Sequence, residues 1–195
     1  MKTLLITAAM AASILAPAAA HAQAVPGAVI AVVDLERVTA ECNACKTAQA
    51  ALRSQATAFE NERKTLGTSL QAERTSIQTA VDALKGKDPD AALQARIKAF
   101  QTKGQEAQQE VERSRAQLQA NQAYIRKQIA DKLGPIYSQV MQRRGANVMV
   151  EIGTTLASGA NLDVSNDVLA ALNAALPSVS TTAPAPPRTS QPQGR

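Results

Sequence analysis

Cys42 and Cys45 are the only cysteines in the sequence, and their spacing allows several kinds of chemistry. A Cys-x-x-Cys pair at a helix start can be a redox centre, half of a zinc site, or a local disulfide. The redox interpretation lacks an alternating strand–helix pattern, and the zinc interpretation lacks a second ligand pair. Near a helix start, this spacing brings the Cα atoms within the usual disulfide range of about 4.4–6.8 Å. The pattern favours a structural disulfide, while interchain or free thiols, redox chemistry and metal binding stay open.

The first 22 residues have the features of a secretory signal peptide. Lys2 precedes an apolar run that ends near Pro17, and Ala20-His21-Ala22 provides a small-residue cleavage site. The run is too short to span a hydrocarbon core of about 30 Å, so we expect cleavage after about Ala22 and an exported, soluble protein. An exported compartment favours oxidised cysteines.

His21 is the only histidine, and it would leave with the signal peptide. Its loss removes the commonest general base and the commonest transition-metal ligand from the mature chain. We therefore expect no catalytic residues, no cofactor, no bound metal and no enzymatic activity.

Long helices with a narrow apolar seam are the main structural feature that the composition predicts. Of 195 residues, 40 are Ala and 18 are Gln, whereas aromatic residues make up 2%. From about Leu35 to Gln142 the pattern is helical, with one break at 85–90 that contains Gly and Pro. On both sides of the break, apolar residues recur at steps of three, four and seven, as in a coiled coil. The seam comprises Leu52, Phe59, Leu66, Leu70, Ile77, Val81, Leu84, Leu93, Ile97, Phe100, Gly104, Ala107, Val111, Leu118, Ile125 and Ile129.

The turn at 85–90 predicts that the two helical segments fold back on each other as an antiparallel hairpin. This arm is expected over 46–140, and each helix should reach about 70 Å at 1.5 Å per residue. Gly67 and Gly104 should lie near each other in this register. They predict either close packing of the helices or a flexible joint, and the thin seam around them favours the joint.

A small discontinuous body, at 25–45 and 141–176, is expected to frame the arm. Val29–Asp34 and 148–152 are β-branched runs that predict strands, and 162–164 predicts a third. Ser165 is expected to cap a last helix that runs to about Leu176. The fold class is thus α+β, a long antiparallel α-helical coiled-coil hairpin inserted into a small β-sheet body.

The body is expected to oligomerise, and the segment after it is expected to be disordered. About 57 residues bury a marginal core and leave sheet edges open, so several copies should share one body. Residues 177–195 consist mainly of Pro, Thr, Ser, Ala and Gln, which predicts a disordered tail.

The predicted arm is basic and the rest of the chain is slightly acidic. Residues 46–144 contain 17 Lys and Arg against 10 Asp and Glu, whereas the remainder contains 4 against 6. A basic surface attracts anionic partners, although a solvated helix face has the same composition. Nucleic acid is disfavoured because no aromatic stacking groups are interleaved with the basic residues. The candidate binding residues, all in the tip half of the arm, are Lys64, Arg74, Lys85, Lys87, Arg96, Lys98 and Lys103.

The order of these elements resembles that of the Skp/OmpH family of periplasmic chaperones. Residues 30–34 (IAVVD) with Val38 resemble the family's opening strand and turn, and 145–150 (GANVMV) resemble its middle strand. The closing strand and helix cap are matched by 162–165 (LDVS), followed by Val168, Leu169, Leu172 and Asn173. The resemblance extends to about Leu176. The cysteine pair and the Pro-rich tail depart from the family pattern.

This resemblance implies a periplasmic homotrimer whose strands form a small shared barrel and whose three hairpins surround a cavity. It implies an ATP-independent holdase chaperone that cages unfolded outer-membrane proteins between basic arms. Anionic lipid and lipopolysaccharide are further candidate partners. Two other functions stay open: a structural coiled-coil spacer or adaptor of the cell envelope, and a thiol-redox protein that uses Cys42 and Cys45.

Overall fold

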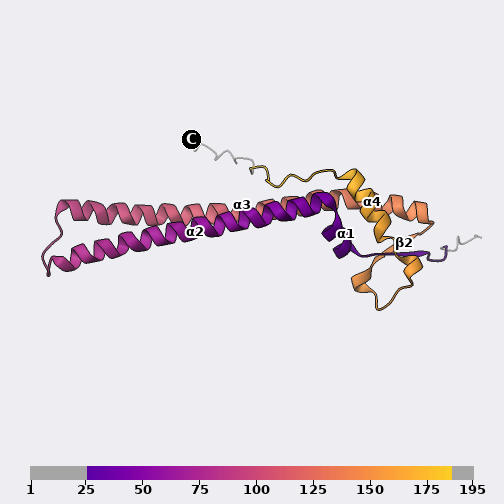
Figure 1. The fold of residues 1–195 in the computed structure, drawn as a ribbon, viewed down its shortest axis with the longest axis horizontal. Helices are drawn as coiled ribbons and strands as arrows, with labels where there is room; N and C mark the ends of the chain where they lie inside the picture. Colours follow the sequence, from indigo (N-terminus) through magenta and orange to yellow (C-terminus); the bar gives the residue numbers. More distant parts are fainter. Residues whose placement is uncertain (1–25, 186–195) are drawn as a thin grey trace, which may run out of the picture.

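The computed structural model describes residues 26–185, which form a long helical arm attached to a small body (Figure 1). In chain order the elements are β1 (Ile30–Val33), α1 (Leu35–Glu41), α2 (Asn43–Ala83), α3 (Ala91–Arg144), β2 (Val148–Glu151), the short 3-10 turns η1 (Ile152–Thr154) and η2 (Ala160–Leu162), and α4 (Ser165–Ala175). The predicted α+β class, with a helical hairpin inserted into a small β-sheet body, is confirmed. The predicted signal peptide lies outside the described residues.

The sheet of the body pairs the two ends of the arm. β1 and β2 run parallel, with Ile30 opposite Val148 and Val33 opposite Glu151. Parallel neighbours need a long crossover connection, and here the whole arm is that connection. Ala31, Val32 and Val33 of β1 are buried, whereas β2 is half-buried or exposed.

The predicted third strand at 162–164 is wrong. This segment forms η2 and a single bridge between Asp163 and Val32. The Asp163 carboxylate accepts hydrogen bonds from the backbone N–H and the hydroxyl of Ser165, which turns the chain into α4. Ser165 therefore does not cap α4 with its side chain. Its hydroxyl oxygen instead accepts from the backbone N–H of Asp34 at 2.8 Å and ties α4 to the end of β1.

The hydrophobic core lies where α1, the start of α2, the end of α3 and α4 meet. Val38, Val140, Val168 and Leu172 are fully buried there. The other members of the core are Ala31, Val33, Cys42, Ala44, Cys45, Leu133, Ile136, Val164 and Leu176. Because Leu133 and Ile136 pack in this cluster, the body includes more of α3 than the predicted boundary at 141.

A second helix break, which the sequence analysis did not predict, separates α1 from α2 at Cys42. This residue has φ −55° and ψ 129°, so it ends one helix and begins the next. Its sulfur accepts from the Cys45 backbone N–H at 3.3 Å, and the Asn173 side chain accepts from the Asn43 N–H at 2.9 Å. These contacts satisfy donors that the break leaves without intrahelical partners.

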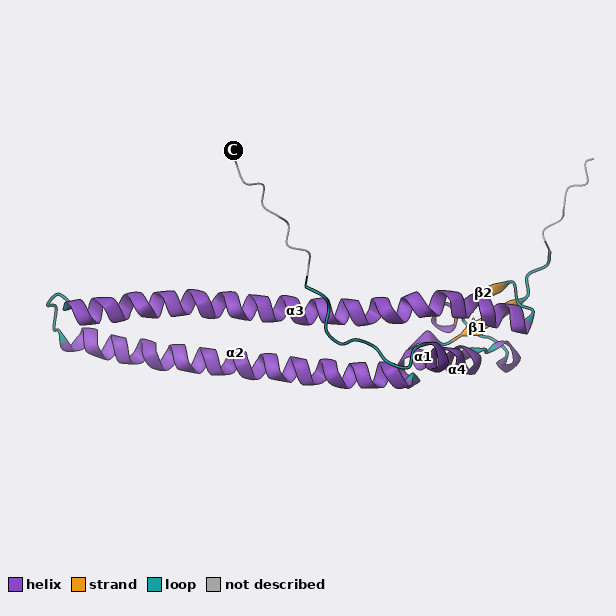
Figure 2. Cartoon of the chain, turned by 90° about the horizontal axis from the view of Figure 1, so that it is seen from above, coloured by secondary structure: helices purple, strands orange, loops and turns teal. Residues whose placement is uncertain are grey.

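The arm consists of α2 and α3, which lie side by side over most of their length (Figures 1 and 2). Their 41 and 54 residues span about 60 and 80 Å at 1.5 Å per residue. The turn occupies the predicted position: Gly86 has φ 88°, and the Asp90 carboxylate caps α3 by accepting from the Leu93 N–H at 2.8 Å. No helix within residues 26–185 is long and apolar enough to cross a membrane.

The segment after α4 differs from the predicted disordered tail. Residues 177–185 run back from α4 along the arm and form hydrogen bonds with both of its helices (Figures 1 and 2). Val179 packs against the core, and backbone groups of Ser180, Thr181 and Ala183 bond to side chains of the arm. Residues 186–195 of the predicted tail lie outside the described residues.

Candidate functional site

The two helices of the arm contact each other along a thin seam. Every seam residue named from the sequence is buried or half-buried, which confirms the predicted helical faces. Between residues 49 and 120, however, only Ile77 and Ala107 are buried. The remaining seam side chains are partly exposed, so apolar surface along the arm stays accessible to solvent.

Polar contacts between the helices supplement the seam near the tip. The Arg96 guanidinium donates to the Ser76 hydroxyl at 2.7 Å, and the Lys103 ammonium lies 2.9 Å from the Glu73 carboxylate. The Lys103 ammonium also donates to the Ser69 hydroxyl at 3.4 Å. Exposed pairs of this kind contribute between zero and about 1 kcal/mol each, so the outer arm is weakly held.

The glycines at 67 and 104 are not required for close packing within one chain. A Cβ atom built at either position would have no other atom within 4 Å. The close-packing interpretation is therefore wrong for the isolated chain. The flexible joint stays a prediction.

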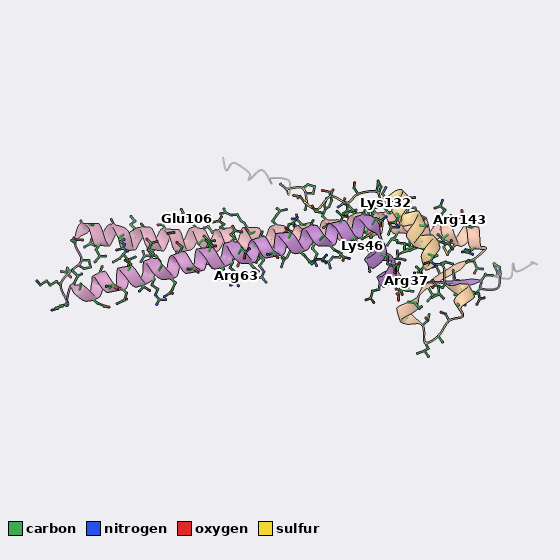
Figure 3. The ribbon with its side chains drawn as sticks, viewed as in Figure 1. Arg37, Lys46, Arg63, Glu106, Lys132 and Arg143 are labelled. Atoms are coloured by element: carbon green, nitrogen blue, oxygen red, sulfur yellow. A yellow bond between two sulfur atoms is a disulfide. The ribbon has the colours of Figure 1, made fainter. Side chains whose placement is uncertain are left out.

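The seven basic residues named from the sequence are all exposed, and they are distributed on both sides of the turn. The structure brings two of them, Arg96 and Lys103, into contacts with α2. Within residues 26–185, Lys64, Arg74, Lys85, Lys87 and Lys98 have no carboxylate within ion-pair distance. They form a diffuse basic surface, without a converging pocket. Charged side chains elsewhere on the arm, such as Arg63 and Glu106, also project outward (Figure 3).

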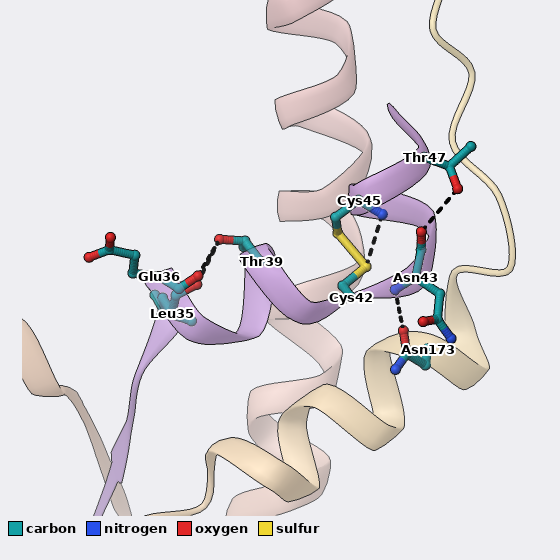
Figure 4. The surroundings of a disulfide bond; sticks show 8 residues. All are labelled: Leu35, Glu36, Thr39, Cys42, Asn43, Cys45, Thr47 and Asn173. Carbon is teal, nitrogen blue, oxygen red and sulfur yellow. Dashed lines mark hydrogen bonds between the residues drawn. A yellow bond between two sulfur atoms is a disulfide. The ribbon is translucent and has the colours of Figure 1, made fainter. Parts of the chain in front are cut away.

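Cys42 and Cys45 form a disulfide at the base of the arm, with their Cα atoms 5.1 Å apart (Figure 4). Both residues are almost completely buried in the core, and Asn173 of α4 contacts the same turn. A buried disulfide is poorly placed to exchange with a bulky dithiol substrate, because exchange requires in-line access to a sulfur atom. Among the described residues, no group of three or more His, Cys, Asp and Glu side chains could hold a metal ion.

One polar cluster in the body has a perturbed carboxyl group. The hydrogen bonds from the Ser165 side chain and backbone lower the pKa of Asp163, and the nearby Arg37 guanidinium adds to this shift. Arg37 also donates to the Asn166 side chain at 2.9 Å, so the cluster joins α1 to the start of α4. Burial raises the pKa of Tyr137 in the adjoining part of α3.

Three amide side chains on the inner part of the arm hold the residues that follow α4. Gln55 lies on α2, and Asn121 and Gln128 lie on α3; we call these residues the amide cluster. Asn121 is 5% exposed. An open groove continues from the amide cluster toward the tip, and its lining includes Phe59 and Leu118.

A family model for outer membrane proteins of the OmpH-like type matches residues 29–172, which extend from β1 into α4. The chain belongs to the OmpH-like family. The match includes both strands, the disulfide and the complete arm of this OmpH-like protein. It ends before residues 177–185, so the segment that contacts the amide cluster lies beyond the matched region.

A solved structure supports the fold of this OmpH-like protein. The chain is similar to a crystal structure of an OmpH-like protein from Caulobacter crescentus CB15, described as a candidate outer membrane chaperone. The TM-score is 0.65 at 20% identity, over 80% of this chain and 89% of the Caulobacter chain. At this identity the likeness shows the shared fold alone. A search of curated proteins gave no match.

The amide cluster of this OmpH-like protein was not predicted from the sequence. One signal was present: the seam steps by seven from Leu118 to Ile125, and Asn121 occupies the intermediate position. A polar residue at a seam position is costly unless it is hydrogen-bonded, so its presence indicates a specific partner. Nothing in the residue types indicated that this partner would include the chain's own carboxyl-terminal segment.

Proposed function

We propose that this OmpH-like protein is an ATP-independent periplasmic holdase that cages unfolded outer-membrane proteins between its arms. The observation that carries the proposal is the arm itself, which extends far beyond the core and leaves its apolar seam partly exposed. Many weak apolar contacts along such a surface can add up to firm holding while each contact stays reversible. Membership of the OmpH-like family supports a chaperone role.

Charge supports the same proposal. The arm segment 46–144 has a net charge of +7, from 17 Lys and Arg against 10 Asp and Glu. Such a field would increase the rate at which an acidic unfolded chain meets the arms. Anionic lipid and lipopolysaccharide stay further candidate ligands of the same exposed side chains.

We further propose that three copies assemble through their bodies. β2 is only half-buried, and large apolar side chains of the strands and the following loop are exposed, namely Val29, Ile30, Val148, Ile152 and Leu156. An apolar strand edge of this kind favours pairing with another chain. A shared body would place three arms around a common cavity.

The test is an aggregation assay. An unfolded β-barrel outer-membrane protein is diluted from urea with and without the full chain, in the absence of nucleotide, and light scattering is recorded. The proposal expects scattering to be suppressed at a stoichiometric ratio and a soluble complex to be recovered. Unchanged aggregation would overturn it, and stable binding of one folded envelope protein at the tip would favour the spacer function instead.

A further inference from the structure

Residues 177–185 are attached at one end to the core and then follow the arm. Leu176 is 5% exposed, Val179 packs against the core, and the chain then passes over α3 (Figure 2). This tail segment, 177–185, contacts both helices of the arm without forming a helix or a strand of its own.

The amide cluster binds the tail segment through its main chain. The Gln128 side chain donates to the Ser180 carbonyl at 2.9 Å and accepts from the Ser180 N–H at 3.0 Å. The Gln55 amide donates to the Thr181 carbonyl at 3.1 Å, and the Asn121 side-chain carbonyl accepts from the Ala183 N–H at 2.8 Å. None of these four bonds uses a side chain of the tail segment. Any polypeptide with a similar backbone path could therefore make them, as in other modes of main-chain recognition.

Part of this arrangement is built without any contribution from the tail. The Gln117 side chain donates to the Asn121 carbonyl at 2.7 Å, and the Asn121 amide donates to the Gln55 carbonyl at 2.9 Å. These bonds orient Gln55 so that its own amide points to the tail segment. The two facing helices thus present one donor, the Gln55 amide, and one acceptor, the Asn121 side-chain carbonyl, in fixed positions. This arrangement lowers the ordering cost of binding an extended chain.

The hydrogen-bonded contact between the tail segment and the arm ends at Ala183. Ala183 supplies the last backbone donor, and Pro184 has no N–H to continue the series. Beyond this point the groove lined by Phe59 and Leu118 continues toward the tip. A longer polypeptide could follow the amide cluster and then place apolar side chains in this groove.

We propose that the amide cluster is a binding site for the backbone of an extended polypeptide and that the chain's own tail segment occupies it as an intramolecular competitor. This inference rests on the proposed holdase function, since the displacing polypeptide is an unfolded client. A client segment must displace residues 178–183 before it reaches the inner part of the arm.

The size of the effect follows from the fraction of time for which the tail is bound. A tethered segment competes at an effective concentration in the millimolar range for a short linker. If the tail occupies the site for about nine-tenths of the time, the apparent affinity for an external ligand falls about tenfold.

The first experiment uses the full chain with the double substitution Ser180→Pro and Ala183→Pro. These substitutions remove both backbone donors and leave the length of the tail unchanged. The control is Thr182→Pro, because the Thr182 N–H has no acceptor within residues 26–185. The probe is a fluorescent peptide with the sequence of residues 178–185, together with the same peptide N-methylated at the two donating amides.

The double variant should bind the unmodified peptide about tenfold more tightly than the parent and the Thr182→Pro control. The N-methylated peptide should not bind, because it lacks the two N–H groups. Equal affinity in the parent and the double variant would overturn the proposal, as would tight binding of the N-methylated peptide.

The second experiment changes the arm. Gln128→Leu, introduced into the double variant, should abolish peptide binding, whereas Gln122→Leu, at an exposed position on the same helix, should leave it unchanged. Unchanged helical circular dichroism would exclude a folding defect. In the parent, Gln128→Leu should also increase hydrogen exchange at the Ser180 amide, whose acceptor it removes. Unchanged exchange there would mean that Gln128 does not hold the tail.

Measuring the capture of an unfolded client by the parent and by the double variant distinguishes a failure of this inference from a failure of the proposed function. If the double variant captures an unfolded outer-membrane protein more tightly than the parent, the tail competes with clients. If the peptide binds more tightly but the client binds both forms equally, the tail is a structural brace and the inference fails. If no form of the chain holds any client, the proposed function fails and so does the tail's role as a competitor of clients, even where the peptide results stand.

Discussion

The body and the outer arm differ in how completely their apolar side chains are buried. In the body, Val38, Val140, Val168 and Leu172 are fully buried, and four helices contribute to one cluster. In the outer arm, from 49 to 120, seam residues such as Leu66 and Leu118 are only half-buried. Since local stability follows buried apolar contacts, the body should be a cooperative unit and the outer arm a set of weakly coupled turns.

In the proposed holdase, the arm would bind clients and the body would supply stability. A surface that binds many unfolded chains benefits from partly exposed apolar side chains and from flexibility, both of which reduce its own stability. The small body would offset this loss of stability because its apolar side chains are buried in one cluster and a disulfide cross-links it. The following changes test whether stability and client binding are separated in this way.

The largest expected effect comes from shortening the arm. Replacing residues 61–114 by a short Gly-containing turn joins α2 and α3 near the level where Phe59 and Leu118 share one groove. The core stays complete, so light scattering should report the proposed trimer, while suppression of client aggregation should be lost. A monomer would place assembly in the arms, and full holding activity would place client binding in the body or at the amide cluster of the inner arm.

A matched pair of leucines compares the two regions directly. Leu172→Ala removes a fully buried side chain and should lower the free energy of unfolding by about 2–5 kcal/mol. Leu118→Ala should lower it by less than about 1 kcal/mol, because that side chain is already half-exposed. Urea unfolding at a fixed protein concentration measures both. Equal losses would show that body and arm unfold as one unit.

The disulfide should stabilise the body without taking part in holding. Changing Cys42 and Cys45 to Ser should lower the free energy of unfolding by about 2 kcal/mol, from the chain-entropy estimate for a very short loop. A reducing agent should lower the free energy of unfolding of the parent by a similar amount and should not change that of the variant. Client holding should persist in the double Ser variant. Its complete loss would indicate that the thiols act on the client.

Charge should affect the rate of capture more than stability. Changing Lys85, Lys87, Arg96 and Lys98 to Gln removes four exposed charges near the turn. Association with an acidic client at low salt should slow by a factor of about 3–10, and rising salt should mimic the effect in the parent. Each substitution should change the free energy of unfolding by less than about 0.5 kcal/mol.

The control for this variant removes the same number of charges nearer the body. It changes Lys46, Arg53, Lys132 and Arg143 to Gln, all of which are exposed. A smaller decrease in the association rate is expected if clients enter at the tip. Stopped-flow fluorescence would measure both rates, and equal capture by parent and tip variant would mean that the basic tip is simply a solvated surface.

The smallest expected effect concerns pH and is confined to the body. Because hydrogen bonds from Ser165 lower the pKa of Asp163 in the folded state, the ionised carboxylate stabilises the body above the unfolded pKa of about 3.9. This contribution should be lost as the pH falls through the lowered folded pKa. Asp163→Asn should therefore cost less than about 1 kcal/mol at pH 7, since the side chain is partly exposed.

Urea titrations of parent and Asp163→Asn at pH 7 and at low pH would test this. The difference in the free energy of unfolding between the parent and Asp163→Asn should shrink as the pH falls below about 3.9. Asp88→Asn, in the turn of the arm, controls for loss of a carboxylate outside the body. A difference that grows at low pH would contradict a lowered pKa of Asp163 in the folded state.

Sequence periodicity predicted the arm well because a helical seam repeats over many residues. Steps of three, four and seven located every seam residue from Leu52 to Ile129, and Gly86 with Pro89 located the turn. The break at Cys42 was missed because the residues on both sides favour a helix. That break depends on the tertiary contact between Asn43 and Asn173.

Features that depend on distant side chains could not be predicted. A strand at 162–164 was expected from its β-branched and apolar residues. Hydrogen bonds from Ser165 to the Asp163 carboxylate turn the chain there, and Ser165 is itself held by the Asp34 N–H. The tail segment was expected to be disordered from its composition. It is held by side chains of residues more than 50 positions away, and no local pattern records such contacts.

The parallel pairing of β1 with β2 requires the chain to close a very long loop during folding. Val29 bonds to Asn147, which is 118 residues further along the chain. Closing a loop of that length is entropically costly, but the arm folds from local contacts and can bring its two ends together first. The hairpin therefore acts as a folding scaffold for the body, and its turn sets how soon β1 finds its neighbour.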